Sequence, residues 1–434
     1  MSAIYPFAAL RPAPAAAADV ASVPYDVVNT EEARALAAGN PLSFLHVSRP
    51  EIDLPAGADP HGDAVYQLAA RNFDKLKAAA PLVIEDAPSF YIYRLTMGAH
   101  VQSGVAACFS IDEYDRGFIK KHEKTRPDKE DDRTRHMLAI GAQTGPVFLT
   151  YRASTAVDAV VARAIKGKPL FTLTPADGVR HEVWRVEAAE HQPIVDAFAM
   201  IRSLYIADGH HRAASAARAR RTLEQKAEGT GQKAEGTGHK AEGTRHKAEG
   251  TRHKAEGTRH KAEHEEFARV LAVAFPDNQM QVLPYNRVVK DLHGLTAAEF
   301  LASLKRRLTV RDGGPAAPAR KGEIAIYLAG RWHTLVMPAA AVSLDVDLLQ
   351  TSILEPILGI DDVRTDKRID FVGGIRGTGE LERLVDSGAF AVAFSLFPVS
   401  VDDLMRIADA GGIMPPKSTW FEPKLRDGLL AHLI

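Results

Sequence analysis

The segment LYIADGHHR, residues 204–212, places an acid, a glycine, two histidines and an arginine between an apolar run and an Ala-rich run. The apolar run predicts a strand and the Ala-rich run predicts a helix. A turn at Gly209 would bring polar side chains to the helix N-terminus, where N–H groups and the helix dipole favour an anion such as phosphate. Arg212 adds a planar charged fork for phosphate oxygens, and His210 and His211 add donors or metal ligands.

Asp208, at the end of the same predicted strand, can hold a metal ion or accept a proton. The alternative interpretation is a capped helix in which Asp208 lies near the N-cap and the histidines serve packing. Two adjacent histidines directly after Asp-Gly are unusual for a cap, which favours the functional interpretation.

A second candidate is the charged run KKHEKTRPDKEDDR, residues 120–133. Such runs are usually a solvated helix or loop. This run lies between a predicted apolar hairpin and a segment with a clear strand pattern, and it contains acidic, basic and imidazole side chains. Glu123, beside His122, could be a general base or a metal ligand. Lys129 and Arg133 lie four residues apart, on one helical face, where they could complement phosphate charge.

A third candidate is GGIMPPKSTWFEPKL, residues 411–425, whose three prolines exclude a helix. Lys417, Ser418 and Thr419 supply a cation and two hydroxyls suited to a phosphate or a carboxylate. The segment DFVGG, residues 370–374, is a weaker candidate and equally a strand and turn. No GxxxxGK[ST] loop is present, which excludes a P-loop kinase, and GxSxG, HExxH and GxGxxG are absent as well.

The elements that must position these segments alternate between strand and helix patterns. Residues 90–97 and 101–111 predict a β-hairpin. Further strands are expected at 146–151, 181–187, 203–208, 268–276 and near 323–336, and helices at 64–79, 192–201, 213–225, 296–307 and 345–358. The alternation predicts a mixed α/β (α+β) fold. Boundaries near 85 and 290 would give an N-terminal segment 1–85, a core 86–290 and a C-terminal α/β segment 291–434.

Residues 226–263 repeat a heptad of the type KAEGTRH. A coiled-coil seam is excluded because only Ala could line it and each complete copy contains Gly. We expect a solvated, disordered spacer inside a surface loop that can be deleted without loss of activity. The repeated histidines, which could bind adventitious metal, are His239, His246, His253 and His260.

The composition is that of an ordinary globular protein: 434 residues, 46% hydrophobic, with 54 Lys+Arg against 55 Asp+Glu. This balance argues against a dedicated nucleic-acid binder. A single cysteine, Cys108, excludes an intrachain disulfide and indicates a reducing compartment. With no secretory signal pattern and no apolar stretch of about 20 residues, a cytoplasmic protein without a membrane partner is expected. The oligomeric state is left open.

Together the segments 120–133, 204–212 and 411–425 resemble the signatures of a bacterial domain-of-unknown-function family, number 1015. The resemblance runs from about Pro6 to Leu430, apart from the heptad spacer.

The ADGHHR box is also similar to the phosphate-binding box of the ParB/sulfiredoxin superfamily, which includes partition CTPases, sulfiredoxins and free serine kinases. This resemblance implies a nucleotide-binding core with N- and C-terminal elaborations. Gly209, His210, His211 and Arg212 would be phosphate ligands, and Asp208 would match the acid of the kinases' box. The pair His122–Glu123 resembles the short HE pair that contains the kinases' catalytic Glu.

Two departures narrow the choice within that superfamily. A sulfiredoxin has Cys where this chain has His210. A partition protein carries a helix-turn-helix and usually a basic surface, and this neutral chain shows neither, so DNA is not an expected partner.

We therefore expect an enzyme that uses ADP or ATP with Mg²⁺ and moves a phosphoryl group onto or off a small hydroxyl metabolite, most plausibly L-serine or O-phosphoserine. Glu123 would be the general base and Asp208 would hold Mg²⁺ or orient the hydroxyl. Glu123 and Arg212 would line one cleft within roughly 12 Å of each other, with Lys129 or Arg133 facing it and loop 417–419 at its rim.

Two alternatives stay open. One is a nucleotide-binding regulator without catalysis. The other is a metal-dependent phosphohydrolase that uses His122, His210 and His211 as ligands.

Overall fold

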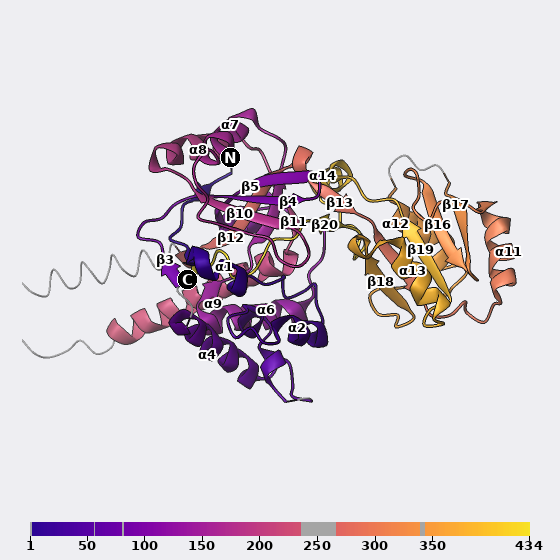
Figure 1. Ribbon diagram of the computed structural model, residues 1–434, viewed down its shortest axis with the longest axis horizontal. Helices are drawn as coiled ribbons and strands as arrows, with labels where there is room; N and C mark the ends of the chain where they lie inside the picture. The colour runs from indigo at the N-terminus through magenta and orange to yellow at the C-terminus, as the bar shows by residue number, and fades with distance from the viewer. Residues whose placement is uncertain (1, 56, 80–81, 236–265, 339–342) are drawn as a thin grey trace, which may run out of the picture. The chain divides into compact units, whose positions relative to one another are not determined.

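The computed structural model describes residues 2–55, 57–79, 82–235, 266–338 and 343–434 (Figure 1). The chain divides into two compact units. The first comprises residues 1–121, 125–279 and 423–434, and the second comprises 122–124 and 280–422. This division differs from the three expected segments. Residues 1–85 share a unit with the expected core, the second unit begins at 280, and residues 423–434 belong to the first unit because they pack and pair within it.

A nine-stranded mixed sheet is the centre of the first unit, with the order β6-β11-β8-β12-β5-β4-β10-β9 and with β1 paired to β5. β8 runs parallel to β12 and β11 parallel to β6, whereas the other pairs are antiparallel. The strands are β1 (Ile4–Tyr5), β4 (Tyr91–Met97), β5 (His100–Ser110), β6 (Ile119–Lys120), β8 (Val147–Tyr151), β9 (Phe171–Leu173), β10 (Arg180–Arg185), β11 (Leu204–Asp208) and β12 (Arg269–Pro276). The expected hairpin and mixed α/β fold are confirmed.

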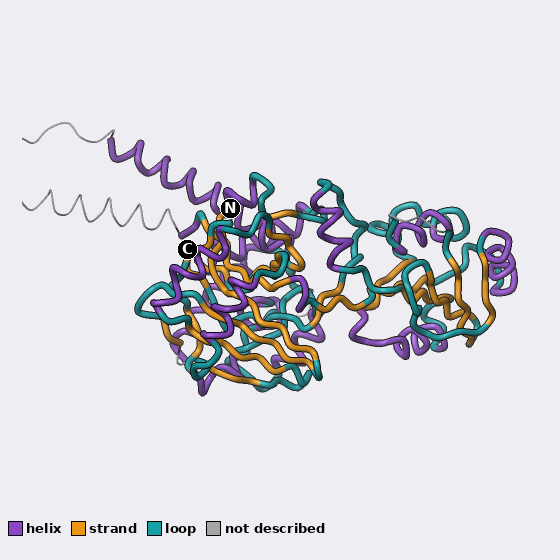
Figure 2. The backbone as a smooth tube through the Cα atoms, turned by 90° about the horizontal axis from the view of Figure 1, so that it is seen from above, coloured by secondary structure: helices purple, strands orange, loops and turns teal. Residues whose placement is uncertain are grey.

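The helices of the first unit form two groups around these strands (Figures 1 and 2). α6 (Pro127–Ile140) packs between α4 (Asp63–Ala79) and α9 (His210–Glu235), and α7 (Thr155–Ala164) packs on α8 (His191–Ala199). The shorter helices are α1 (Ala17–Val20), α2 (Thr30–Ala37), α3 (Leu45–Ser48) and α5 (Ile111–Asp115). The Ala-rich start of α9 lets this helix lie close to the sheet, and Ala213, Ala216 and Ala217 are buried in the main core.

Alternate residues of β5 face two different environments. Val105, Ala107 and Phe109 join α7, α8 and α9 in the main core. On the other face of the sheet, Tyr91 of the neighbouring strand β4 packs edge-on against Phe7, near the start of the chain. Phe7 in turn packs edge-on against His432, near the end of the chain. The terminal segments also form the short pairs β2 (Leu10–Pro12) with β3 (Leu82–Ile84) and β7 (Ala142–Gln143) with β21 (His432–Leu433).

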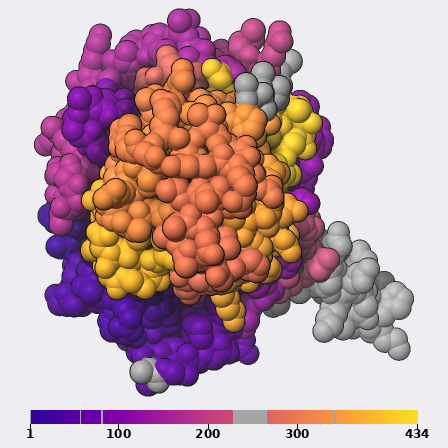
Figure 3. Space-filling model, turned by 90° about the vertical axis from the view of Figure 1, so that its right-hand side faces the viewer, coloured from indigo at the N-terminus to yellow at the C-terminus, as the bar shows by residue number. Residues whose placement is uncertain are grey.

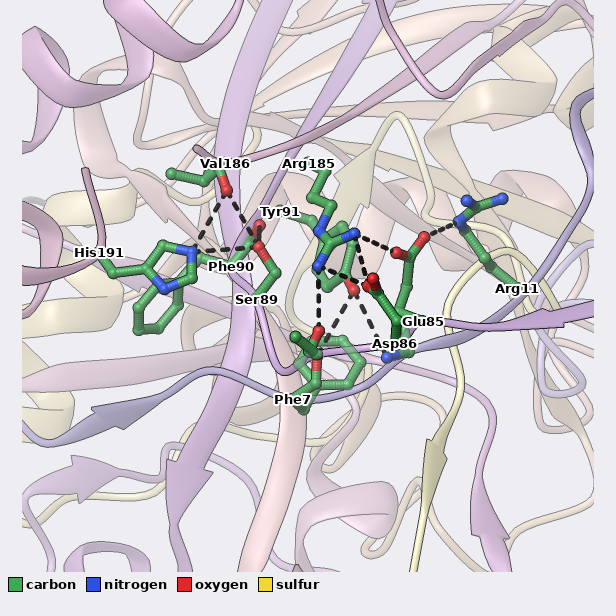
Figure 4. A network of polar contacts seen from close by, with 12 residues as sticks. Phe7, Arg11, Glu85, Asp86, Ser89, Phe90, Tyr91, Arg185, Val186 and His191 are labelled. Atoms are coloured by element: carbon green, nitrogen blue, oxygen red, sulfur yellow. Dashed lines mark hydrogen bonds and ion pairs between the residues drawn. The ribbon is translucent and has the colours of Figure 1, made fainter. Parts of the chain in front are cut away.

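A polar network fixes the N-terminal segment beside this sheet (Figure 4). The buried Glu85 accepts from Arg11 at 2.5 Å and from Arg185 at 2.6 Å. Nearby, the hydroxyl of Ser89 donates to the carbonyl of Val186 at 3.0 Å. Through Glu85, these contacts connect Arg11, near the start of the chain, to Arg185 at the end of β10.

The second unit is built on a six-stranded antiparallel sheet with the order β15-β17-β16-β19-β14-β18. Its elements are β14 (Tyr285–Val289), β15 (Thr309–Asp312), β16 (Glu323–Leu328), β17 (Arg331–Val336), β18 (Ile369–Gly373), β19 (Val392–Leu396), α11 (Ala297–Arg307), α12 (Asp345–Leu349), α13 (Gly377–Asp386) and α14 (Val401–Asp409). A separate pair joins β13 (Gln281–Leu283) to β20 (Trp420–Glu422). Figure 3 shows one face of this unit, covered by the orange part of the chain.

Two expected boundaries are wrong. The helix expected at 345–358 is α12 only to Leu349, followed by a π-helical turn at Gln350–Leu354. Residues 226–235, which were expected to belong to a disordered spacer, are the end of α9. Propagating an existing helix costs little, and Lys, Ala and Glu are good helix formers, so the two glycines at 229 and 231 do not stop it.

The rest of the repeat, with all four of its histidines, lies outside the described residues. Within the described ranges, no helix has both the length and the apolar character needed to cross a membrane.

Candidate functional site

The turn between β11 and α9 depends on Gly209. β11 ends at Asp208 and α9 begins at His210, so a single residue reverses the direction of the backbone. Gly209 has a φ of +93°, and a Cβ there would lie 3.0 Å from Nε of Arg212. Glycine therefore relieves two constraints, a backbone conformation that other residues avoid and a steric conflict with the arginine.

Asp208 binds two cationic side chains through one oxygen. Its Oδ2 accepts from Nη2 of Arg212 at 3.3 Å and from Nζ of Lys424 at 3.2 Å, while Oδ1 accepts from the N–H of Gly209 at 3.0 Å. Burial by itself would raise the pKa of Asp208, but Lys424 and Arg212 hold it well below its usual range. Asp208 is therefore a carboxylate, and with its two partners it forms a cluster of net charge +1 at a helix N-terminus.

Arg212 is almost fully buried, with 8% of its surface exposed. Its Nη1 donates to the carbonyl of Pro146, and Nη2 lies 3.9 Å from Oδ2 of Asp26. Its Nε has no hydrogen-bond partner among the described residues. Burial would lower the pKa of Arg212, whereas Asp26 and Asp208 raise it above its ordinary value, so the side chain is a permanent buried cation with one donor unused.

Two hollows lie beside Arg212 in the first unit. Asp208, Arg212 and Lys424 line the smaller one, whose empty space, counting the part open to solvent, is about 210 Å³. The larger one, about 480 Å³ on the same basis, is lined by Arg212, Arg133, Tyr25 and Asp427 among others. Arg212 thus forms a wall of both hollows.

Asp427 faces Arg212 in the larger hollow. A Cβ on Gly145 would lie 2.9 Å from Oδ1 of Asp427 and 3.4 Å from Cδ of Arg212, so glycine is what allows these two side chains to approach. Asp427 is 3% exposed, and burial raises its pKa to about 7, against the lowering effect of Arg212. This carboxyl group therefore titrates near neutral pH.

Arg133 and Lys129 lie on α6, as their spacing predicts. Arg133 donates to Oδ2 of Asp132 at 2.8 Å and to the carbonyl of Ser48 at 3.1 Å, and its guanidinium lies 4.4 Å from the ring centre of Tyr25. Lys129 is half-buried on the same helix. Arg133 is thus held by protein groups in the wall that it shares with Arg212.

The two histidines after Gly209 differ in exposure. His210 is buried, at 6% exposed, and His211 is half-buried. The N–H of Arg126, the residue before α6, donates to Nε2 of His211 at 3.1 Å. His211 therefore joins the start of α9 to the start of α6.

The remaining predicted site residues belong to the second unit. His122 and Glu123 belong to the short piece 122–124 of that unit. Lys417, Ser418 and Thr419 belong to its longer piece, 280–422. The N–H of Met414 donates to the carbonyl of His122 at 2.7 Å, which brings the second and third sequence candidates together. The expected approach of Glu123 to Arg212 would join residues of both units and stays a prediction.

The expected magnesium role of Asp208 does not fit this arrangement. Both of its oxygens accept hydrogen bonds, and two of the three donors are cationic side chains. Within the described ranges, no group of three or more His, Cys, Asp or Glu side chains is placed to hold a metal ion. The metal-dependent hydrolase, whose ligands His122 and His210–His211 belong to different units, stays a prediction.

Four residues of this site were not predicted from the sequence: Tyr25, Asp26, Lys424 and Asp427. Lys424 falls inside the segment 411–425, whose predicted ligands were Lys417, Ser418 and Thr419. Asp427 precedes a glycine, and Tyr25 and Asp26 follow a proline, which are signals of turns rather than of sites. Only the fold shows that these turns meet at Arg212.

The chain belongs to the family described as protein of unknown function (DUF1015), whose model matches residues 4–352. The family membership expected from the sequence is confirmed. The curated proteins compared with this chain include no match.

Several solved structures are similar to the chain. A point mutant of a free serine kinase in complex with AMP has 13% identity and a TM-score of 0.36, covering 75% of this chain and 92% of that one. A second free serine kinase mutant, in complex with ADP, has 13% identity, a TM-score of 0.35 and coverages of 75% and 92%. A conserved hypothetical protein from Pyrococcus furiosus has 14% identity, a TM-score of 0.35 and coverages of 75% and 94%. Because these scores are low, they transfer neither a ligand nor a reaction to this chain.

Proposed function

We propose that the protein binds a nucleotide through its terminal phosphate at the N-terminus of α9 and transfers a phosphoryl group to a small hydroxyl metabolite. The observation that carries this proposal is the pairing of Arg212 and Lys424 with one carboxylate, Asp208, beside the hollow at this helix end. Cationic side chains and helix N–H groups are the donors that phosphate oxygens prefer.

Phosphate binding would rearrange these contacts rather than require new residues. Nζ of Lys424 donates to Asp208 at the end of a long, rotatable side chain, and in the proposed complex it turns from that oxygen to a phosphate oxygen. Arg212 has Nε unused while its Nη1 stays bound to Pro146. Asp208 would then remain paired with Arg212, which keeps the guanidinium plane oriented toward the ligand.

In the proposed reaction Glu123 accepts the proton of the substrate hydroxyl. With ADP as the donor, the hydroxyl oxygen forms a bond to the β-phosphorus, the bond from that phosphorus to the bridging oxygen breaks, and AMP leaves. The catalytic contribution would be positioning and charge neutralisation, which is what phosphoryl transfer requires of a protein. The substrate that we propose is L-serine, with O-phosphoserine as the product, or the reverse reaction from O-phosphoserine and AMP.

The experiment that tests this proposal follows ADP or ATP with L-serine by phosphorus NMR in the presence of the full-length protein. Appearance of O-phosphoserine together with AMP or ADP supports it, and Glu123→Gln should abolish this product while leaving nucleotide affinity nearly unchanged. Arg218→Lys, on the same helix as Arg212 but paired with Asp131, is the matched control and should retain turnover. Nucleotide binding without turnover would instead favour the regulator.

A further inference from the structure

The second unit contains a hollow next to the loop that carries Lys417 and Ser418. Its empty space, counting the part that opens to solvent, is about 330 Å³. Its lining combines two carboxylates and one lysine with apolar and aromatic groups, and it includes Tyr285, Lys321, Asp345, Leu396, Phe397, Asp403 and Ser418. None of these residues has a part in the nucleotide site proposed above.

A buried arginine fixes the loop at the edge of this hollow. Arg287 is 1% exposed, and it donates to the carbonyl of Lys417 at 3.2 Å and to the carbonyl of Tyr285 at 2.5 Å. Lys417 has a φ of 57°, a strained value for a residue with a side chain. The hydroxyl of Ser418 donates to the carbonyl of Pro415 at 2.6 Å. These contacts hold the wall formed by Ser418 in one position.

Asp345 is the unusual group in this hollow. It is 5% exposed, and its Oδ1 accepts from the N–H of Gly322 at 2.9 Å. Its Oδ2 is buried and has no hydrogen-bond partner in the part of the chain that the structure describes. Burial raises the pKa of Asp345 above its ordinary value, although the hydrogen bond from Gly322 and the charge of Lys321 lower it. A buried carboxylate oxygen without a donor costs free energy, and a bound donor would recover it.

The chemistry of the surroundings defines the missing donor. Lys321 lies close enough to act on Asp345 through its charge, but its Nζ donates hydrogen bonds to both oxygens of Asp403, at 3.0 and 3.1 Å. A divalent metal is not favoured, since no group of three or more potential ligands is found within the described ranges. We therefore infer a ligand with a cationic hydrogen-bond donor. Because Leu396 and Phe397 also line the hollow, the rest of this ligand should be short and apolar.

We propose that this hollow is a second ligand site, which binds a small primary amine with its ammonium group on Oδ2 of Asp345 and its hydrocarbon part against Leu396 and Phe397. The site does not depend on nucleotide binding. The buried Arg287 acts as a positioning residue, since it holds the loop that supplies Ser418.

The test uses saturation-transfer NMR on the full-length protein with isobutylamine as the probe and isobutanol as its uncharged counterpart of equal shape. We expect transfer to the amine and little to the alcohol. Asp345→Asn keeps the size of the side chain and the acceptor for Gly322, and it should weaken amine binding about tenfold by removing a charge-assisted contact. Asp370→Asn, on the exposed side of β18, should bind as the wild type does.

Three results would overturn the proposal. One is equal transfer to isobutylamine and isobutanol in the wild type, which needs no variant to interpret. Another is undiminished amine binding by a folded Asp345→Asn protein. A loss of binding in both the Asp345 and the Asp370 variants would also contradict it, because the effect would then come from overall charge.

Discussion

Lys424 donates to Oδ2 of Asp208 at 3.2 Å, although 216 positions separate the two residues in the sequence. The contact exists because residues 423–434 pack in the first unit, where the N–H of Arg426 donates to the hydroxyl of Tyr93 at 3.3 Å. The last residues of the chain therefore complete the cluster at the β11–α9 turn, and removing them should remove one of its two cations.

Lys424→Met tests the role of this cation directly. The variant keeps the length of the side chain but removes its charge, so we expect ADP to bind about tenfold more weakly, as for loss of one charge-assisted contact. Lys75→Met, on the exposed side of α4, is the control and should leave affinity unchanged. Calorimetric titration measures both. Equal affinities for the two variants would show that Lys424 serves only the ion pair with Asp208.

Gly209→Ala should destabilise the protein by about 1–3 kcal/mol, because alanine at a φ of +93° is strained and its Cβ would press on Arg212. Gly178→Ala is a matched control, since Gly178 has a φ of +75° with no atom within 4 Å of the added Cβ. Chemical denaturation measures both free energies of unfolding. If the two variants lose equal stability, contact with Arg212 contributes nothing to the requirement for glycine.

The raised pKa of Asp427 predicts that the stability of the protein depends on pH. Burial raises its folded-state pKa to about 7, above the value of about 3.9 in an unfolded chain. Between these values the folded protein keeps a proton that the unfolded chain has lost, so the free energy of unfolding falls as pH rises through this window. Asp427→Asn lacks this proton.

The measurement is the melting temperature at about pH 5 and about pH 8. We expect the wild type to lose several degrees more than Asp427→Asn over this interval. Asp370→Asn should behave like the wild type because Asp370 is exposed. Parallel profiles for the wild type and Asp427→Asn would mean that Asp427 is ionised throughout.

The sequence predicts most elements of the fold because their patterns are local. The hairpin of β4 and β5 and the strand β11 follow from apolar periodicity, and the start of α9 follows from its alanines. The return of residues 423–434 to the first unit has no local signal, since it depends on pairing with β7 far along the chain. The division at 280 is likewise a property of tertiary contacts.

The candidate site also contains residues that the sequence predicts and residues that it does not. Asp208, Gly209 and Arg212 are predictable because strand, turn and helix follow one another in a single segment. Asp26 and Asp427 reach Arg212, and Lys424 reaches Asp208, from distant turns. A lone charged residue in a turn looks like an ordinary solvated one. The partners of Arg212 within the protein were also unpredictable, because a guanidinium suited to phosphate is equally suited to a carboxylate.

The central claim is that Arg212 binds a nucleotide phosphate in addition to its ion pair with Asp208. The most direct measurement is calorimetric titration of ADP into the wild type, Arg212→Ala, Arg212→Lys and the control Arg218→Ala, with melting temperatures to confirm that each is folded. The account predicts that Arg212→Ala loses at least about 2 kcal/mol of binding free energy, that Arg212→Lys recovers only part of it, and that Arg218→Ala loses none. Unchanged ADP affinity in a folded Arg212→Ala protein would contradict the account.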